Sequence, residues 1–488
     1  MQKGQKISVV CIGAGPAGLT AAYILGKNNV KVTVLEKNPV YVGGISRTEI
    51  YKGFAFDIGG HRFFSKSQEI ETLWKELLGE ALLLRSRKSR ILYKRKFFDY
   101  PLRAGNALRQ LGIIETLRCI ISYIHVRLYP NRNPQNFQDW VTNHFGKRLY
   151  TIFFRSYTEK VWGVPCTQIS ADWAAQRIKG LSLSKAIWNA LWFKKQKQNS
   201  KNVIKTLIGS FHYPRRGPGM LWEKTKDRIK QQGNKVLLGM NVVEINLLKD
   251  KTWQIITEDP TQKRHEFFAD HVISSMPIRE LGEILKPTLP KVAKIAAASL
   301  QYRDFLTVAL ITKGKSLFDD NWIYIHDPSV QVGRIQNFKS WSPEMVPDLA
   351  YNCYGLEYFC FETDKIWSMP DDELIHMAIN EMTQIRLIVP SDVVDGVVIR
   401  QPKAYPVYDD HYDTNVKTLR NVLENDYAGL HLVGRNGMHK YNNQDHAMMT
   451  AILTVKNILA GYQKYDVWTV NEDAEYHEED KTTSSKDI

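Results

Sequence analysis

A glycine-rich turn near the amino terminus constrains the fold of this chain more than any other feature. An apolar run leads into Gly13, Gly15 and Gly18, which keep the spacing G-x-G-x-x-G, and a helical pattern follows. A second apolar run ends at Glu36, near the distance of about 20 residues at which such units carry an acid for a ribose hydroxyl. The glycines allow a tight turn, a close backbone approach to a pyrophosphate, and packing of the helix on the sheet. The sequence therefore predicts a dinucleotide-binding unit.

Length and composition place the chain among large globular proteins. Its 488 residues, 43% of them hydrophobic, are enough for more than one domain. The five cysteines show no C-x-x-C spacing, and the polar segment before the first apolar run is too short for a signal peptide. No apolar run reaches the roughly 18 residues that span a bilayer. We therefore expect a cytoplasmic protein.

The formal net charge of +15 points to an anionic partner. A nucleotide, a nucleic acid and a lipid headgroup all satisfy a basic surface, and charge alone does not choose among them. The stretch 184–211 mixes tryptophans with lysines. This pattern fits a helix on an anionic membrane, but it favours a solvated helix followed by a basic loop, with the tryptophans in the core. Peripheral membrane contact stays open.

Two further glycine pairs lie downstream of the fingerprint. Gly43 and Gly44 form the first pair, and Gly59 and Gly60, followed by His61, form the second. Paired glycines indicate a backbone pressed against another group, although two hairpin turns would also require them. Because both pairs follow a nucleotide-binding unit, together they favour a cofactor that carries a ring system as well as a pyrophosphate.

The order of apolar patterns predicts a discontinuous architecture. Segments 1–68, 211–285 and 425–465 are expected to form the cofactor-binding domain, around an insertion, 69–210, that is mainly helical. Residues 286–424 are expected to form a β-sheet substrate domain, and 466–488 a disordered tail. The run 429–435 predicts a last buried strand, and 444–459 a closing helix whose amino terminus favours anionic groups.

Several of these motifs together resemble the FAD-dependent amine oxidase-like superfamily. The resemblance rests on the fingerprint, the two glycine pairs, His61 and the strand end 433–435. The blocks 160–165 (KVWGVP) and 443–446 (NQDH) are more specific and resemble the UDP-galactopyranose mutase family in its eukaryotic-type form. This resemblance implies a GR2-type flavoprotein of the α/β class. Such a protein has a Rossmann-like FAD-binding domain, an inserted helical domain and an antiparallel β-sheet substrate domain.

The resemblance also implies an activity. Such enzymes are FAD-dependent mutases that interconvert the pyranose and furanose forms of an NDP-sugar without net redox chemistry. The N5 atom of reduced flavin is the nucleophile at the anomeric carbon. FAD must then be reduced, and NADPH or NADH could supply the electrons. The expected partner is a nucleotide-diphosphate sugar for cell-surface glycan biosynthesis, with no nucleic acid and no metal, and the oligomeric state is open.

Two other functions remain open at this point. One is a flavin-dependent oxidoreductase of the amine oxidase or protoporphyrinogen oxidase-like type, which would oxidise its substrate. The other is a non-catalytic flavin-binding or nucleotide-binding protein that attaches to a membrane by its basic face.

The resemblance assigns roles to individual residues. Arg177 and Arg334 would hold the substrate diphosphate, and His61 would tune the flavin. Tyrosines would line the diphosphate and sugar pocket: Tyr324, Tyr405 and Tyr441. Tyr100 and Trp162 would stack on the base, with Thr158 at its border. The FAD site would consist of Gly13, Gly15, Gly18, Glu36, Gly43, Gly44, Gly60, Val242, Gly434, Arg435, Asn443 and Gln444.

The base pocket departs from the family pattern. Thr158 stands where eukaryotic-type mutases carry asparagine, and Leu102-Arg103 stands where they carry Phe-Gln. Both positions border the base, so the sequence leaves the nucleotide and the sugar open while the diphosphate and flavin motifs remain.

Overall fold

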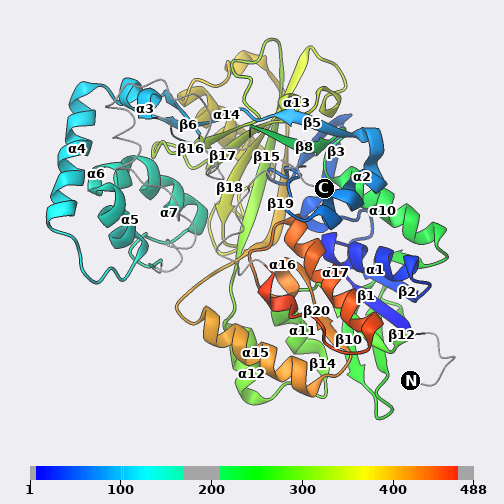
Figure 1. The fold of residues 1–488 in the computed structure, drawn as a ribbon. Helices are drawn as coiled ribbons and strands as arrows, with labels where there is room; N and C mark the ends of the chain where they lie inside the picture. Colours follow the sequence, from blue (N-terminus) through cyan, green and yellow to red (C-terminus); the bar gives the residue numbers. More distant parts are fainter. Residues whose placement is uncertain (1–6, 101, 103, 170, 172–208, 471–488) are drawn as a thin grey trace, which may run out of the picture.

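The computed structural model describes residues 7–100, 102, 104–169, 171 and 209–470. Arg177, most of the basic stretch 184–211 and most of the predicted tail lie outside the described residues. The described part contains a parallel sheet covered by helices, a larger mixed sheet, and a group of helices beside the larger sheet (Figure 1).

A five-stranded parallel sheet forms the centre of the cofactor region. Its strands lie in the order β20 (Leu430–Leu432), β13 (His271–Ser274), β1 (Ser8–Ile12), β2 (Lys31–Glu36) and β9 (Lys235–Leu238). Every neighbouring pair is parallel. Elements cover both faces of such a sheet, so its strands are short apolar runs rather than alternating ones.

Helices cover one face of this sheet. They are α1 (Pro16–Lys27), α2 (Gln68–Leu78), α10 (Gly219–Gln231) and α17 (Gln444–Ala460). Their apolar sides share one core with the sheet, in which Leu19, Trp222 and Val455 are almost fully buried. Figure 1 shows α1, α10 and α17 side by side over the sheet, so the last helix of the chain packs beside the first.

The other face carries a second, four-stranded sheet. Its order is β12 (Arg264–Ala269), β11 (Trp253–Glu258), β10 (Asn241–Leu247) and β14 (Leu285–Lys286). The helices packed here are α11 (Ile278–Ile284), α12 (Lys291–Ser299) and α15 (Tyr412–Asp426). The last two come from 286–424, which was expected to form the substrate sheet. They lie here because their apolar sides, including Ala293 and Leu419, complete this core.

A seven-stranded sheet forms the substrate region. Its order is β19 (Val393–Pro406), β15 (Tyr302–Lys313), β18 (Tyr351–Cys360), β17 (Arg334–Asn337), β16 (Trp322–Ile325), β6 (Ser89–Tyr93) and β7 (Lys96–Asp99). The sheet is antiparallel except that β6 pairs with β16 in parallel. Helices α13 (Phe338–Trp341) and α14 (Asp371–Gln384) accompany it.

The range 69–210 is therefore not helical throughout. It contributes β6 and β7 to the large sheet, and β5 (Leu82–Ser86) pairs with β8 (Ser210–Pro214). These strands form because apolar side chains such as Ile91, Leu92 and Phe98 are buried between layers of the protein.

Helices follow these strands within the same range. They are α3 (Ala104–Leu111), α4 (Ile113–Leu128), α5 (Phe137–Phe145), α6 (Lys147–Tyr150) and α7 (Ser156–Trp162), with a π-helical turn over Thr151–Arg155. Gly112 and Gly146 separate successive helices at φ of 80° and 83°. This left-handed backbone favours glycine and ends a helix.

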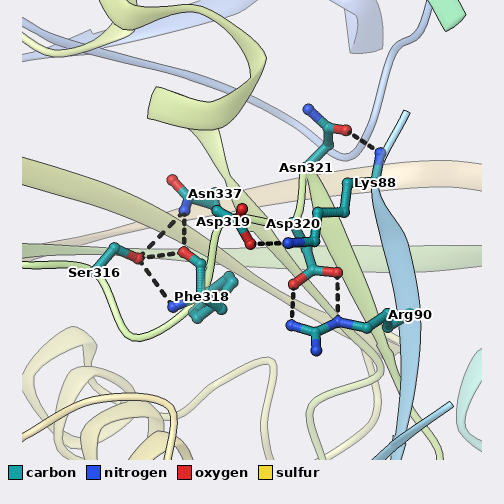
Figure 2. Close-up of polar contacts among 8 residues, drawn as sticks. All are labelled: Lys88, Arg90, Ser316, Phe318, Asp319, Asp320, Asn321 and Asn337. Atoms are coloured by element: carbon teal, nitrogen blue, oxygen red, sulfur yellow. Dashed lines mark hydrogen bonds and ion pairs between the residues drawn. The ribbon is translucent and has the colours of Figure 1, made fainter. Parts of the chain in front are cut away.

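The parallel attachment of β6 is secured by a polar network at the sheet edge (Figure 2). Arg90 donates from Nε and Nη2 to the two oxygens of Asp320, at 2.8 and 2.5 Å, and the Asp320 side chain is fully buried. The backbone N–H of Lys88 donates to Asn321 Oδ1 at 2.8 Å. Nearby, Asn337 donates to the carbonyl of Phe318 at 3.1 Å. The network thus joins β6 to the loop before β16.

Two features are absent from the described residues. None of their helices combines the length and apolarity that crossing a bilayer requires. Within the same part of the chain, no three histidine, cysteine, aspartate or glutamate side chains are grouped so as to hold a metal ion.

Candidate active site

The turn after β1 forms a cradle of backbone atoms. Gly13 has a φ of 94°, and its N–H donates to the carbonyl of Leu35 at 2.8 Å. A Cβ on Gly18 would lie 1.9 Å from the carbonyl oxygen of Gly13, so α1 approaches the turn more closely than any side chain allows.

Gly15 faces open space at the amino terminus of α1. A Cβ on Gly15 would meet no atom within 4 Å, and its backbone is extended at φ −79°. No side chain caps α1, and Pro16 occupies its first turn. The amino terminus of a helix attracts anions through its free N–H groups. The space in front of Gly15 therefore suits a pyrophosphate.

The first glycine pair, Gly43 and Gly44, lies directly against this turn. The N–H of Gly43 donates to the carbonyl of Ala14 at 2.8 Å, and a Cβ on Gly44 would lie 3.5 Å from the Cα of Gly15. Glu36 accepts from the N–H groups of Ala14 at 2.7 Å and Asn38 at 2.8 Å. These donors orient the carboxylate at the cradle, where the lone pairs that remain can accept from a ribose.

The closing helix meets the same cradle from the other end of the chain. Gly434 has a φ of 79°, and its Cβ would lie 3.0 Å from the Cβ of Ala17. Asn443 caps α17 through a capping box with His446. The amide of Gln444 is buried, and its nitrogen and oxygen find no hydrogen-bond partner among the described residues. Because buried amides are normally paired, this one suits a polar group of a bound cofactor.

The structure places Val242 in a hydrophobic core and makes the predicted last strand shorter than expected. Val242 lies at a β-bulge of β10 and packs in the core beneath the second sheet, together with Leu35. The run 433–435 does not continue the last strand, because β20 ends at Leu432 and Gly434 begins the short helix α16 (Gly434–Gly437).

The second glycine pair, Gly59 and Gly60, lies over the seven-stranded sheet. It follows the hairpin of β3 (Thr48–Tyr51) and β4 (Phe54–Asp57). A Cβ on Gly60 would lie 2.8 Å from Gln336 Nε2, and one on Gly59 would lie 3.8 Å from Arg334 Nη2. The pair thus joins the cofactor region to the strand that carries Arg334.

His61, directly after this pair, is held neutral. Its Nδ1 atom is buried and finds no hydrogen-bond partner in the described part of the chain. Burial, together with the guanidinium charges of Arg435, Arg334 and Arg47, lowers the pKa of His61 to about 3. Three arginines therefore lie close enough to His61 to disfavour its protonated form.

Arg334 is fixed on β17 by a buried acid on the neighbouring strand. Its Nε and Nη2 atoms lie 2.6 and 2.5 Å from Oε2 of Glu357, the residue opposite it on β18. Gln336 donates to the other oxygen of Glu357 at 2.7 Å. Burial is the largest single influence and lowers the pKa of Arg334, but Glu357 and the neighbouring tyrosines together outweigh it, so this pKa is raised well above its ordinary value. The guanidinium is thus permanently charged.

Aromatic side chains gather next to Arg334. The ring of Tyr324 lies 4.8 Å from that of Tyr100 and 5.4 Å from that of Tyr157. Tyr157 stacks on His326 at 4.9 Å. Burial raises the pKa of Tyr157 well above its ordinary value, more than the charge of Arg334 lowers it, so the phenol keeps its proton. Protonated phenols can donate to phosphate oxygens without adding charge.

A second aromatic pair is organised by Arg435. Tyr405 and Tyr441 stack with ring centres 5.5 Å apart and planes 14° apart. The Arg435 guanidinium carbon lies 5.1 and 5.3 Å from these two ring centres. It also donates to the carbonyls of Ala404 at 2.8 Å and Asn442 at 2.9 Å. Arg435 thus supplies the cation that this pair of rings would attract.

The motif 160–165 joins the helical region to the site. Lys160 Nζ donates to the carbonyls of Ile325, Asp327 and Val332, at 3.1, 2.7 and 3.1 Å. Burial lowers the pKa of Lys160 to about 8. These bonds fix the loop between β16 and β17, the strands that carry Tyr324 and Arg334.

Lys160→Met is expected to destabilise the protein by about 3 kcal/mol, because it leaves three carbonyls of a packed loop without their donor. Urea unfolding followed by circular dichroism measures the change. Lys52→Met is the matched control: this lysine pairs with Asp395 but is 64% exposed, so the loss should stay within about 1 kcal/mol. If the two variants lost the same free energy of unfolding, Lys160 would not be what fixes this loop.

The sequence pattern of the flavin-containing amine oxidoreductases matches residues 16–398. The chain belongs to this family. The protein is thus an enzyme of the flavin amine oxidase-like superfamily, and the predicted α/β fold of this superfamily is confirmed. The glycine cradle, the unpaired amide of Gln444 and the open space at Gly15 all fit a bound flavin nucleotide.

Solved structures of this superfamily share the fold of the flavoenzyme. Reduced UDP-galactopyranose mutase superposes with a TM-score of 0.81 at 22% identity, and the match covers 96% of each chain. A putative protoporphyrinogen oxidase from Exiguobacterium sp. 255-15 gives 0.71 at 16%, covering 94% of this chain and 99% of its own. Putrescine oxidase with bound putrescine gives 0.61 at 14%, covering 93% and 99%.

Curated relatives match over shorter stretches. The FAD-dependent monooxygenase ankC of Aspergillus thermomutatus is 32% identical over 127 residues, which is 24% of this chain and 20% of that protein. A protein from the nifH2 3′ region of Methanothermococcus thermolithotrophicus is 42% identical over 55 residues, or 11% of this chain and 52% of its own. The matches thus span a minor share of the first relative and half of the second.

The flavoenzyme brings most of the predicted substrate residues to one region. His61, Arg334 and Arg435 interact electrostatically, and Tyr324 and Tyr405 lie close enough to influence Arg334. Trp162 packs instead with a cluster of the helical region that contains Phe137 and Val141. Thr158 is buried on α7. For Trp162 and Thr158 a role at the base stays a prediction.

Sequence reasoning missed four residues of this region. They are Glu357, Gln336, Tyr157 and Lys160. Glu357 carried a usable signal, because it is an acid in the otherwise apolar run of β18. Lys160 begins the recognised block 160–165 and Tyr157 precedes it, but nothing in the sequence indicates which residues they contact.

Proposed function

We propose that the protein is an FAD-dependent NDP-sugar mutase of the UDP-galactopyranose mutase type, an intramolecular transferase that interconverts pyranose and furanose forms. The observation that carries this proposal is the group of three arginines around His61: Arg435, Arg334, which is held by Glu357, and Arg47, which pairs with Glu49. A nucleotide diphosphate carries the complementary charge. The likeness to reduced UDP-galactopyranose mutase supports the same substrate class.

The same charges argue against an amine substrate. An ammonium group would meet Arg334 and Arg435 in the site. The stacked rings of Tyr405 and Tyr441 could attract a cation. Arg435 already makes this contact, because its guanidinium lies within the roughly 6 Å of both ring centres that a cation–π contact requires. An oxidoreductase acting on an anionic or neutral substrate is the remaining alternative.

Each residue of the site has a part in the proposed reaction. Reduced FAD bound at the glycine cradle supplies N5 as the nucleophile for the anomeric carbon. Arg334, held by Glu357, grips the diphosphate and stabilises the charge that develops as it leaves. Tyr324 and Tyr405 donate to phosphate oxygens. We assign Arg177 to the same diphosphate on the resemblance alone, with NADPH or NADH as reductant.

His61 and the nucleotide pocket complete the proposal. A neutral imidazole whose Nδ1 lacks a partner can accept a hydrogen bond from the flavin or the sugar. Tyr100, beside Tyr324, is positioned to stack on the base of the nucleotide.

Ligand titration of the oxidised protein tests the substrate class. UDP and TDP are expected to change the fluorescence or absorbance of the bound flavin in a saturable manner, and putrescine is not. The reason is that the site holds guanidinium groups rather than carboxylates that are free to bind an amine. If putrescine instead bleached the flavin in the absence of any added reductant, the protein would be an amine oxidase.

A further inference from the structure

Helix α4 exposes a continuous apolar face. Its exposed aliphatic side chains are Ile113, Ile114, Leu117, Ile121, Ile124 and Leu128, with exposed fractions between 50% and 82%. From Ile114 onward they recur at intervals of three and four residues, so they lie on one side of the helix. The buried side chains Cys119 and Val126 lie on the other side, toward the protein.

The apolar surface extends beyond α4. Leu102 and Leu108, before and on α3, are 42% and 41% exposed, and Tyr129 directly after α4 is 73% exposed. Figure 1 shows α3 and α4 at the outer edge of the helical region, on the side away from α1 and α17. Contiguous exposed apolar surface of this kind marks an interaction site.

A basic groove runs beside this face. It has a volume of about 550 Å³ and lies between α4 and the segments of α5 and α6. Arg118, Lys147 and His125 are its basic side chains, and none of its described lining residues is a carboxylic acid. The nearest acid on α4, Glu115, is neutralised by Arg148 and Arg118. The groove therefore suits an anion.

We propose that α4 lies on an anionic lipid bilayer, with its aliphatic face at the boundary of the acyl chains. Arg118 and Lys147 then contact lipid phosphates, and His125 lies beside them. A helix in the plane of a membrane combines such an apolar face with basic flanks. With 16 residues, α4 is about 24 Å long, which suits a surface contact rather than a span.

Charge favours a bilayer over a second copy of this chain. The spacing of the stripe would allow a coiled coil, in which the flanking positions usually carry pairs of opposite charge. Here those positions hold Arg118, His125 and Arg127, together with isoleucines. Two copies would bring basic residues together without acids to pair them.

Vesicle flotation of the full chain with its flavin tests this surface. The probes are vesicles of phosphatidylcholine alone and vesicles in which about a third of the lipid is phosphatidylglycerol. We expect binding to the anionic vesicles, at least about tenfold weaker binding to the neutral ones, and weaker binding at high salt. Equal binding to both, or to neither, would overturn the proposal.

Two pairs of variants locate the contact. Leu117→Gln with Ile121→Gln should weaken binding by about tenfold or more, whereas Val292→Gln with Ile295→Gln, equally exposed on α12, should not. Arg118→Gln with Lys147→Gln should lose the preference for anionic lipid. The control is Lys230→Gln with Lys249→Gln, which removes the same charge from two exposed lysines elsewhere in the chain. This control should keep the preference for anionic lipid.

Sedimentation velocity distinguishes the alternative occupant. We expect the Leu117→Gln and Ile121→Gln changes to leave the oligomeric state unchanged. If these changes dissociated an oligomer and the vesicles bound nothing, the face would be an interface between copies of this chain. The proposed activity is unaffected by either outcome, because Leu117 and Ile121 are exposed and do not belong to the cluster that contains Tyr100 and Tyr324.

Discussion

Gly15→Val should yield folded protein without flavin. The backbone at this position is extended, and an added Cβ meets no protein atom within 4 Å, so the apoprotein has no reason to unfold. The new side chain would project into the space in front of α1, where the pyrophosphate is expected. The flavin absorbance of the purified protein should fall to a few per cent of normal, while circular dichroism and the mobility on gel filtration stay unchanged.

Gly18→Ala is the comparison that makes this result specific. Its Cβ would lie 1.9 Å from the carbonyl oxygen of Gly13, so the helix must move away from the turn. We expect this variant to be less soluble or to have a lower melting temperature, and also to lose its flavin. A yellow Gly15→Val protein with normal flavin content would contradict the placement of the pyrophosphate at this cradle.

Arg334→Lys should lower kcat by about a hundredfold or more while the flavin stays bound. Lysine keeps a positive charge against the buried Glu357, but it loses the planar fork that can hold a diphosphate in two places. Steady-state kinetics with reduced enzyme measure the effect. Arg334→Ala is less informative, because it also leaves Glu357 buried without a partner, at a cost of about 3–5 kcal/mol in stability.

Arg90→Lys is the matched control in the same sheet. Arg90 on β6 also binds a buried acid, Asp320, through two guanidinium nitrogens (Figure 2). The two substitutions are chemically the same, but Arg90 is not among the groups that influence His61. We expect activity within about twofold of normal for this variant. If Arg90→Lys and Arg334→Lys lost activity equally, the loss would reflect the ion pair and not the diphosphate.

The cofactor region was largely predictable because its determinants are local. The turn at Gly13, the packing of Gly18 on the turn and the acid at Glu36 depend on a few neighbouring residues with fixed spacing. Helix α17 was predicted nearly to its observed ends, because its apolar side chains recur at helical spacing.

The substrate region was less predictable because its contacts join distant segments. Lys160 meets carbonyls more than 160 positions away, and β6 reaches the large sheet by parallel pairing with β16. No periodic pattern encodes such a register. The resemblance assigned Arg334 and Tyr324 to one pocket, and the two residues lie opposite each other on β17 and β16. It could not name Glu357, whose role depends on the pairing of β17 with β18.

Isomerisation by reduced and oxidised protein tests the central claim most directly. The purified protein, oxidised or reduced with dithionite, is incubated with UDP- and TDP-hexopyranoses and the products are separated by chromatography. We predict that at least one sugar nucleotide is converted to its furanose form, and only by the reduced protein. Equal conversion by oxidised protein, or oxidation of a substrate with reduction of the flavin, would contradict a mutase that uses reduced flavin as its nucleophile.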